Sequence, residues 1–288
     1  MQLGVSFPQN GVGGDIGAIR EFVQTAEDLG YDYIFSGDHV LGESPEGFTG
    51  RPGPYTVDYI YHEPFVLFAY MASITTRIRF FTGVLILPQR QATLVAKQAA
   101  ELDHLSGGRL MLGVGVGWNT LEYQALNEDF EHRGSRLEEQ FEVMRRLWCN
   151  DAVDFDGRWH HIQRSGLNPR PVQQPVPLWI GGAAESVLRR TGRIADGWIA
   201  ATDPGVNATP EVIRGPWERV MQYAREAGRD PATLGLHVGA GGGTPDEIRQ
   251  RLDEWQAIGA THATTGARNI PDAQGQIEAI RRFKAALA

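Results

Sequence analysis

An acid and a histidine, Asp38 and His39, stand side by side shortly after an apolar run at residues 33–35. Histidine titrates near neutral pH, so it can donate a proton, accept one, or hydrogen-bond to a developing anion. A single histidine after a strand is as often structural as catalytic. If the strand belongs to a parallel barrel, a position at its C-terminal end favours the catalytic role. His39 is therefore the leading candidate site residue.

Two glycine-rich segments also follow or end apolar runs, at residues 112–119 and 179–186. Glycine lets backbone amides approach a phosphate or a flat ring. The second segment leads into a helix start, near Ser186, that could bind an anion. Close packing explains the first segment equally well, and a turn with a serine cap explains the second. The first segment lacks the G-x-G-x-x-G spacing of dinucleotide-binding folds. Together, on successive strands, they favour a phosphate-bearing cofactor.

The elements that must position these residues alternate regularly along the chain. Stretches with helical periodicity separate eight apolar, β-rich runs, which is typical of an α/β fold of the (β/α)8 TIM-barrel type. The C-terminal ends of barrel strands form one mouth, where Asp38-His39 and both glycine-rich segments should meet. The predicted strands are residues 3–7, 33–35, 78–87, 110–116, 176–180, 197–201, 234–238 and 260–264.

Two insertions interrupt this alternation. Residues 40–62 after strand two are rich in glycine, proline and aromatic residues, and a loop of this length is usually a lid or pocket wall. Residues 151–175 after helix four are predicted to form a small β insertion. The length of 288 residues exceeds that of a usual one-domain barrel, about 250 residues, by roughly one insertion, so 1–288 is predicted to be a single domain. The predicted helices are residues 16–29, 63–76, 93–105, 133–148, 186–195, 210–227, 245–258 and 272–287.

Composition excludes several classes of function. A net charge of −8 argues against nucleic-acid or anionic-membrane partners, which are bound mainly through Lys and Arg. The single cysteine, Cys149, cannot form an internal disulfide, and the N-terminus has no signal-peptide pattern, so we expect a cytoplasmic protein without membrane spans. The pairs His62-Glu63 and His160-His161 lack the spacing of a metal site, and none is predicted.

The motifs together resemble the bacterial-luciferase-like superfamily, and most closely its oxidoreductases that use the deazaflavin coenzyme F420. The resemblance is strongest over residues 1–201, through the motifs at 3–8, 38–39, 82–85, 105–109, 113–118 and 177–182. It implies a tricyclic coenzyme ring across the barrel mouth, with hydride transfer at its central carbon to or from a small organic substrate. It also implies a non-proline cis peptide near Gly83-Val84, a homodimer through helices two and three, and a separate flavin or deazaflavin reductase that supplies reduced coenzyme.

The resemblance also implies which residues form the site. His39 and Trp118 are the expected catalytic residues. Trp118 replaces a glutamate of the family's sugar-phosphate dehydrogenases, and Val116 replaces an arginine of true luciferases; these differences argue against a sugar-phosphate substrate and against light emission. Basic residues that could meet an anionic coenzyme tail are Arg51, Arg170, Arg189 and Arg268. The expected cofactor-binding residues are Asp38, His39, Thr82, Gly83, Val84, Gly115, Gly117, Trp118, Asn119, Gly181, Gly182, Ala183, Ala184 and Ser186.

Two alternatives stay open at this point. One is a two-component monooxygenase of the same fold that uses FMN instead of F420 and receives reduced flavin from a separate reductase. The other is a barrel that binds the coenzyme without catalysis. In each case residues 40–62 and Trp118 are expected to line the pocket, which favours flat, aromatic or apolar ligands.

Overall fold

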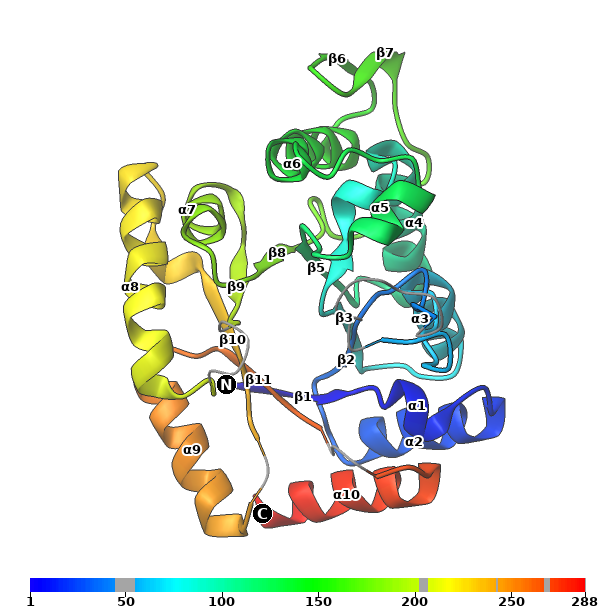
Figure 1. Ribbon diagram of the computed structural model, residues 1–288, viewed down its shortest axis with the longest axis vertical. Coiled ribbons are helices and arrows are strands. Elements are labelled where there is room, and N and C mark those ends of the chain that lie inside the picture. Colours follow the sequence, from blue (N-terminus) through cyan, green and yellow to red (C-terminus); the bar gives the residue numbers. More distant parts are fainter. Residues whose placement is uncertain (45–54, 202–206, 242, 267–269, 288) are drawn as a thin grey trace.

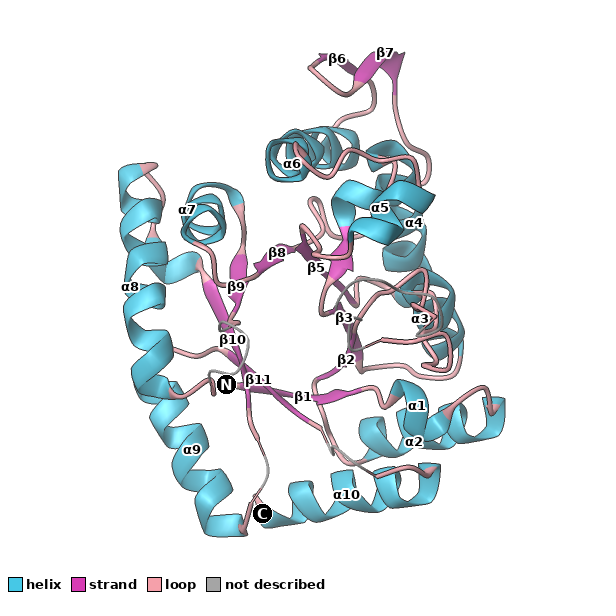
Figure 2. Cartoon of the chain, viewed as in Figure 1, coloured by secondary structure: helices cyan, strands magenta, loops and turns pink. Residues whose placement is uncertain are grey.

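The computed structural model describes residues 1–44, 55–201, 207–241, 243–266 and 270–287. Its centre is a ring of parallel strands inside a layer of helices (Figures 1 and 2). The strand order is β3-β2-β1-β11-β10-β9-β8-β5-β4, and pairing of Phe80 and Phe81 in β3 with Leu110 and Met111 in β5 closes the ring. Because β3 and β4 share one place beside β5, the ring has eight places, as the sequence predicts. The strands are β1 (Gln2–Ser6), β2 (Tyr33–Ser36), β3 (Arg79–Thr82), β4 (Leu85–Ile86), β5 (Leu110–Gly115), β8 (Leu178–Gly181), β9 (Gly197–Ile199), β10 (Gly235–Gly239) and β11 (His262–Thr265).

The third predicted strand is divided in two. A cis peptide bond joins Gly83 to Val84, between β3 and β4, at the place that the resemblance implies. Beyond the break, β4 pairs with the end of β5, through Leu85 opposite Val114. The main chain after Thr82 therefore leaves the regular β3–β5 ladder before β4 pairs with β5 again, next to the mouth of the barrel.

Each predicted helix is present, with ends that differ by a few residues. Pro64 opens α3, where the Glu63 side chain accepts a hydrogen bond from the Val66 amide. Gly107 ends α4 in the left-handed conformation, with φ of 71°, as the glycines after Ser106 predict. The helices of the outer layer are α2 (Ile16–Asp28), α3 (Pro64–Ser73), α4 (Ala92–Ser106), α6 (Arg133–Cys149), α7 (Glu185–Ile194), α8 (Pro210–Glu226), α9 (Pro245–Ala257) and α10 (Ala273–Ala286).

Several short elements of the structure are not predicted from the sequence. The most important is α5 (Thr120–Ala125), directly after β5. The others are α1 (Gln9–Val12) and the 3-10 turns η1 (Leu87–Gln89) and η2 (Pro231–Thr233). Six residues of α5 are too few for helical periodicity to stand out in a sequence. This helix carries a residue that reaches the barrel mouth.

The predicted insertion after helix four is an antiparallel hairpin of β6 (Val153–Asp156) and β7 (His161–Ser165), beyond α6 at the top of Figure 1. Glu139 of α6 holds it: the carboxylate accepts hydrogen bonds from the Arg158, Trp159 and His160 amides and contacts His160 Nδ1 at 2.8 Å. The hairpin is therefore attached to the outer layer and not to the mouth.

Large side chains fill the interior of the ring. Tyr33, Phe81, Met111, Trp179 and Ile199 form a buried cluster inside the strands, separate from the larger core between strands and helices. Glycines on neighbouring strands leave the necessary room: a Cβ atom at Gly197 would lie 2.3 Å from the Trp179 ring. The ring is thus a packed core, and ligand chemistry is confined to its open end. None of the helices in the described ranges combines the length and apolar character needed to cross a lipid bilayer.

Candidate active site

His39 lies just after β2 and pairs with a carboxylate from α5. Its Nδ1 atom is 3.2 Å from Glu122 Oε1 and 3.3 Å from Oε2. The same carboxylate accepts hydrogen bonds at Oε1 from the Val40 amide (2.7 Å) and the Leu41 amide (3.1 Å). The Glu122 side chain is only 1% exposed. The structure therefore brings together a histidine and a buried acid that are 83 positions apart in the chain.

Glu122 is ionised in this setting. Burial acts to raise the pKa of its carboxyl group, but the hydrogen bonds from His39, Leu41 and Val40 outweigh burial and hold the pKa below its usual range. A buried carboxylate that accepts several N–H bonds is stabilised as the anion. Glu122 is thus a fixed negative charge behind the imidazole of His39.

Glu122 is not among the site residues predicted from the sequence. A signal was present, because Asn119 followed three residues later by a glutamate is a helix-start pattern. Asn119 does cap α5, with Oδ1 accepting from the Leu121 and Glu122 amides. The pattern could have revealed the helix. It could not have revealed that the glutamate turns toward β2 instead of back to its own helix. Asn119 remains a predicted cofactor contact, but its side-chain oxygen already serves as the cap.

Aromatic rings surround the imidazole of His39. The ring centroids of Tyr55, Tyr61 and Trp118 lie 4.3, 4.9 and 5.9 Å from that of His39. Tyr59 stacks on Tyr61 at 5.0 Å, and burial raises the pKa of Tyr61, so its hydroxyl stays protonated. These tyrosines belong to the insertion at residues 40–62, whose role as a pocket wall stays a prediction; its residues 45–54 lie outside the described part of the chain. Half of the Trp118 surface is exposed, so this ring is available to a ligand.

Asp38 is buried beside the mouth and already has partners. Its carboxylate accepts hydrogen bonds from Arg90 Nη2 (2.9 Å) and from the Ile86 amide (3.2 Å), and Arg90 also pairs with Glu63 at 3.0 Å. Burial raises the pKa of Asp38 despite the adjacent guanidinium. Because Ile86 lies in β4, Asp38 ties the end of β2 to the segment after the cis peptide bond. A direct contact of Asp38 with a coenzyme stays a prediction.

The glycines of the two predicted segments make room for Val84. A Cβ atom at Gly115 would lie 2.7 Å from Val84 Cγ2, and one at Gly181 would lie 2.7 Å from Val84 Cγ1. A Cβ atom at Gly113 would lie 2.1 Å from the carbonyl oxygen of Thr82. The packing interpretation therefore holds for these glycines. Val84 lies between the ends of β5 and β8 and contributes an apolar surface there.

We expect Gly181→Ala to destabilise the protein by about 1–3 kcal/mol, because the new methyl group meets a stiff, β-branched side chain. Adding Val84→Ala to this variant should recover most of the loss, because it removes Val84 Cγ1, the methyl group that the new Cβ atom at position 181 would contact. Urea denaturation measures both changes. Gly239→Ala is the matched control, because nothing lies within 4 Å of a Cβ atom there. Equal losses at Gly181 and Gly239 would contradict the role assigned to Val84.

The start of α7 lies at the end of β8 and lacks a side-chain cap. The N-cap residue is Ala184, without a side-chain hydrogen bond, and Ser186 lies inside the first turn. The serine-cap alternative is therefore wrong, because the helix begins one residue earlier than predicted. First-turn amides without a side-chain cap remain open to an anion. Gly182, with φ of 136°, leads the chain into this turn, and its carbonyl accepts a hydrogen bond from Trp198 Nε1 at 2.8 Å.

Two of the four predicted basic residues lie in described segments. Arg189, on α7, places its guanidinium over the Tyr223 ring at 5.3 Å. Arg170 pairs with Asp151 at 3.0 Å, at the base of the hairpin insertion. Arg51 and Arg268 lie outside the described residues. Of the predicted basic residues that are described, Arg189 is therefore the one on the same helix as the uncapped first turn of α7.

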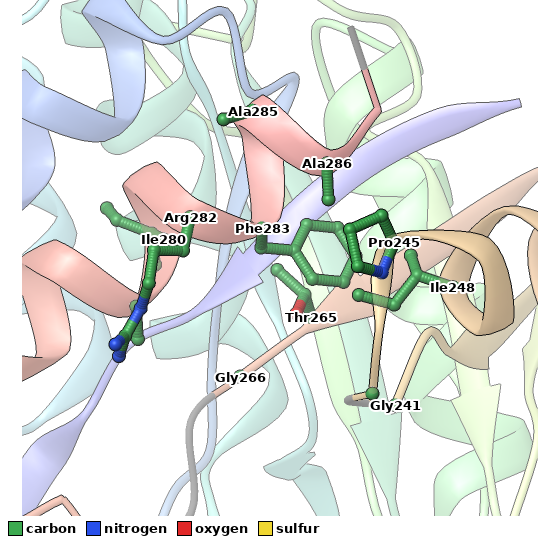
Figure 3. A pocket seen from close by; sticks show the side chains of 12 residues that line it. Gly241, Pro245, Ile248, Thr265, Gly266, Ile280, Arg282, Phe283, Ala285 and Ala286 are labelled. Carbon is green, nitrogen blue, oxygen red and sulfur yellow. The ribbon is translucent and has the colours of Figure 1, made fainter.

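A separate apolar groove lies between α9 and α10 (Figure 3). Its volume is about 700 Å³, and Ile248, Ile280 and Phe283 contribute side chains to it. The described lining comes from α9, α10, the segment after β10 and the end of β11 with Gly266. Among these described residues there is no predicted site residue.

The fold and the site together define a parallel-barrel enzyme with a histidine–glutamate pair at its mouth. A family model described as luciferase-like monooxygenase matches residues 1–242. An uncharacterized protein of Mycobacterium tuberculosis is 34% identical over 248 residues, which cover 84% of this chain and 79% of that protein. An F420-dependent glucose-6-phosphate dehydrogenase of Gordonia bronchialis is 32% identical over 222 residues, which cover 73% of this chain and 60% of the dehydrogenase.

Solved structures agree in fold. A monooxygenase from Streptomyces bottropensis has a TM-score of 0.80 at 20% identity, over 100% of this chain and 98% of that one. An F420-dependent secondary alcohol dehydrogenase, solved with an F420–acetone adduct, has a TM-score of 0.77 at 19% identity, over 100% of this chain and 99% of that one. The chain belongs to the luciferase-like monooxygenase family, and is an oxidoreductase.

Proposed function

We propose that this protein is an oxidoreductase that uses coenzyme F420 to move a hydride to or from a small organic substrate. The observation that carries the proposal is the pairing of His39 with Glu122 inside a ring of aromatic side chains at the strand ends. The coenzyme itself is suggested by the F420-dependent relatives. FMN is the alternative.

The residues at the mouth fit a deazaflavin or flavin. A flat ring system needs an apolar surface to lie against, and Val84, set between Gly115 and Gly181, supplies one. A phosphate group needs donors, and the first turn of α7 has no side-chain cap. On this proposal Gly83 and Val84 would face the ring, and Gly182, Ala183, Ala184 and Ser186 would hold the phosphate. The Thr82 side chain is fully buried and its hydroxyl donates to the Gly113 carbonyl at 2.7 Å, so only the main chain of Thr82 could meet the ring. Gly117, Trp118 and Asn119 would complete the wall after β5.

A bound deazaflavin supplies a carbon that accepts or donates a hydride. The protein must then handle the accompanying proton and keep water away. His39 is the group at the mouth suited to exchange a proton with a substrate hydroxyl or carbonyl oxygen. The rings of Tyr55, Tyr61 and Trp118 limit solvent around the imidazole and favour a flat or apolar substrate body.

Coenzyme choice can be tested by titrating the protein separately with F420 and FMN. A ligand at one hundred times its Kd stabilises the folded state by about 3 kcal/mol, which gives a clear rise in Tm. We expect F420 to raise Tm and FMN to have little effect at equal concentration. The reverse result, with oxygen uptake driven by reduced FMN and substrate, would replace this proposal with the flavin monooxygenase.

A homodimer through α3 and α4 is part of the proposal. Val66 on α3 and Leu94 on α4 are 71% and 53% exposed, although both are large apolar residues. We expect the double variant Val66→Asp/Leu94→Asp to be monomeric by light scattering, because burying two new charges at an interface is costly. Val212→Asp on α8, where the valine is 40% exposed, is the control and should remain dimeric. A native protein that is monomeric would remove this part of the proposal.

A further inference from the structure

We propose that Glu122 is a positioning residue that fixes the imidazole of His39 with its proton on Nδ1 and leaves Nε2 as the nitrogen that exchanges a proton with the substrate. The part that concerns the substrate rests on the function proposed above. The part that concerns the proton on His39 does not.

The Glu122 carboxylate faces hydrogen-bond donors at both oxygens. Oε1 accepts from the Val40 and Leu41 amides, and both oxygens lie within 3.3 Å of His39 Nδ1. Gln89 Nε2 approaches Oε2 at 3.5 Å. An ionised carboxylate only accepts hydrogen bonds, so Nδ1 must carry the hydrogen in this contact. The neutral imidazole then has its lone pair on Nε2.

The geometry also gives Glu122 a second effect. Its contacts with the Val40 and Leu41 amides hold the beginning of the insertion whose later residues, Tyr55 and Tyr61, surround the imidazole. One buried carboxylate therefore orients His39 and anchors the chain that leads to the rings around it. When Nε2 accepts a proton, the fixed negative charge at Nδ1 stabilises the resulting imidazolium.

The substitution Glu122→Gln separates these effects. The amide oxygen can keep the two backbone bonds of Oε1, which places the NH2 group where Oε2 faces His39 and Gln89. The amide oxygen, in the place of Oε1, is 3.2 Å from Nδ1 but is already engaged by the Val40 and Leu41 amides. The NH2 group donates, so we expect Nδ1 to accept from it and the imidazole proton to move to Nε2. The side chain at position 122 keeps its size but loses its negative charge. The ring nitrogen of His39 that carries the proton is expected to change as well. Glu122→Asp keeps the charge with a shorter reach.

Nitrogen-15 NMR of protein labelled at histidine reads the proton position directly, and the His39→Gln variant identifies the His39 signals. In the native protein at a pH where His39 is neutral we expect a protonated Nδ1 and an unprotonated Nε2. We expect Glu122→Gln to reverse this pattern and to lower kcat by about 10- to 1,000-fold, with coenzyme Kd changed by less than about threefold. Glu122→Asp should restore the native pattern in part. Tm reports whether each variant is folded.

Glu139→Gln is the matched control. Glu139 also accepts hydrogen bonds from three backbone amides and pairs with a histidine, His160, but it lies at the hairpin insertion. The Glu139→Gln substitution should leave the His39 signals and kcat unchanged. A native His39 with its proton on Nε2, or a folded Glu122→Gln variant with native His39 signals, would overturn the proposal. Absence of any F420 turnover would overturn the proposed function, and the NMR result would still decide the role of Glu122.

Discussion

Replacing His39 with glutamine is expected to lower kcat by about 100- to 10,000-fold, the usual contribution of a general acid or base. Glutamine retains hydrogen-bonding groups and approximate size, but it cannot take up and release a proton near neutral pH. F420 affinity should change little, because the side chain is proposed to act on the substrate. The measurement is F420 oxidation or reduction in the presence of a small alcohol or carbonyl substrate that the native enzyme turns over.

The control for this prediction is His161→Gln. His161 is exposed on the hairpin insertion and pairs with Asp156 at 2.6 Å, so its loss should not affect turnover. Two outcomes would count against the assignment. Unchanged turnover in a folded His39→Gln variant would remove His39 from the chemistry. Coenzyme binding without turnover of any substrate by the native protein would favour the barrel that only binds.

Acid should destabilise this protein strongly, because two histidines are buried inside the barrel. His237 lies against the Phe35 ring, with centroids 4.5 Å apart, and its Nε2 is 2.6 Å from Thr264 Oγ1. His262 Nδ1 is 2.8 Å from Thr261 Oγ1. Burial lowers the pKa of His237 to about 3, helped by the neighbouring His262. Burial also lowers the pKa of His262 to about 4, helped by Arg79 and the N-terminus.

The direction of the pH effect follows from these values. Unfolded histidine has a pKa near 6.5, so below that pH the unfolded chain binds protons that the folded chain excludes. The contribution of each histidine is fully present above pH 6.5 and is lost as the pH falls toward 4 and 3. At pH 5 each should reduce the free energy of unfolding by about 2 kcal/mol, since one pKa unit corresponds to about 1.4 kcal/mol.

Urea denaturation between pH 7.5 and pH 5 measures this loss. The variant His237→Asn cannot titrate, so its free energy of unfolding should depend on pH about half as steeply as that of the native protein, whatever its absolute stability. His161→Gln, at an exposed position, should keep the native slope. If His237→Asn also keeps the native slope, His237 is not a source of the acid sensitivity.

Much of the fold could be predicted because its signals are local. An apolar run such as residues 33–35 forms a strand, and a proline or glycine at a helix end, such as Pro64 or Gly107, marks that end. Repetition of these units eight times permits few architectures, and the parallel barrel is the one found. The position of His39 beyond the end of β2 is predictable for the same reason, since it depends only on which end of the strand the residue follows.

What the sequence by itself determined is therefore the barrel and the position of His39 and of the glycine-rich segments at the ends of its strands. The tertiary structure decided the partners: Glu122 behind the imidazole, Tyr55 and Tyr61 around it, and Val84 between Gly115 and Gly181. These contacts join strands and loops that are far apart in the chain. They follow from closure of the ring and from the direction in which each side chain points, and neither leaves a periodic signal in the sequence. The chemistry proposed for His39 depends on those partners.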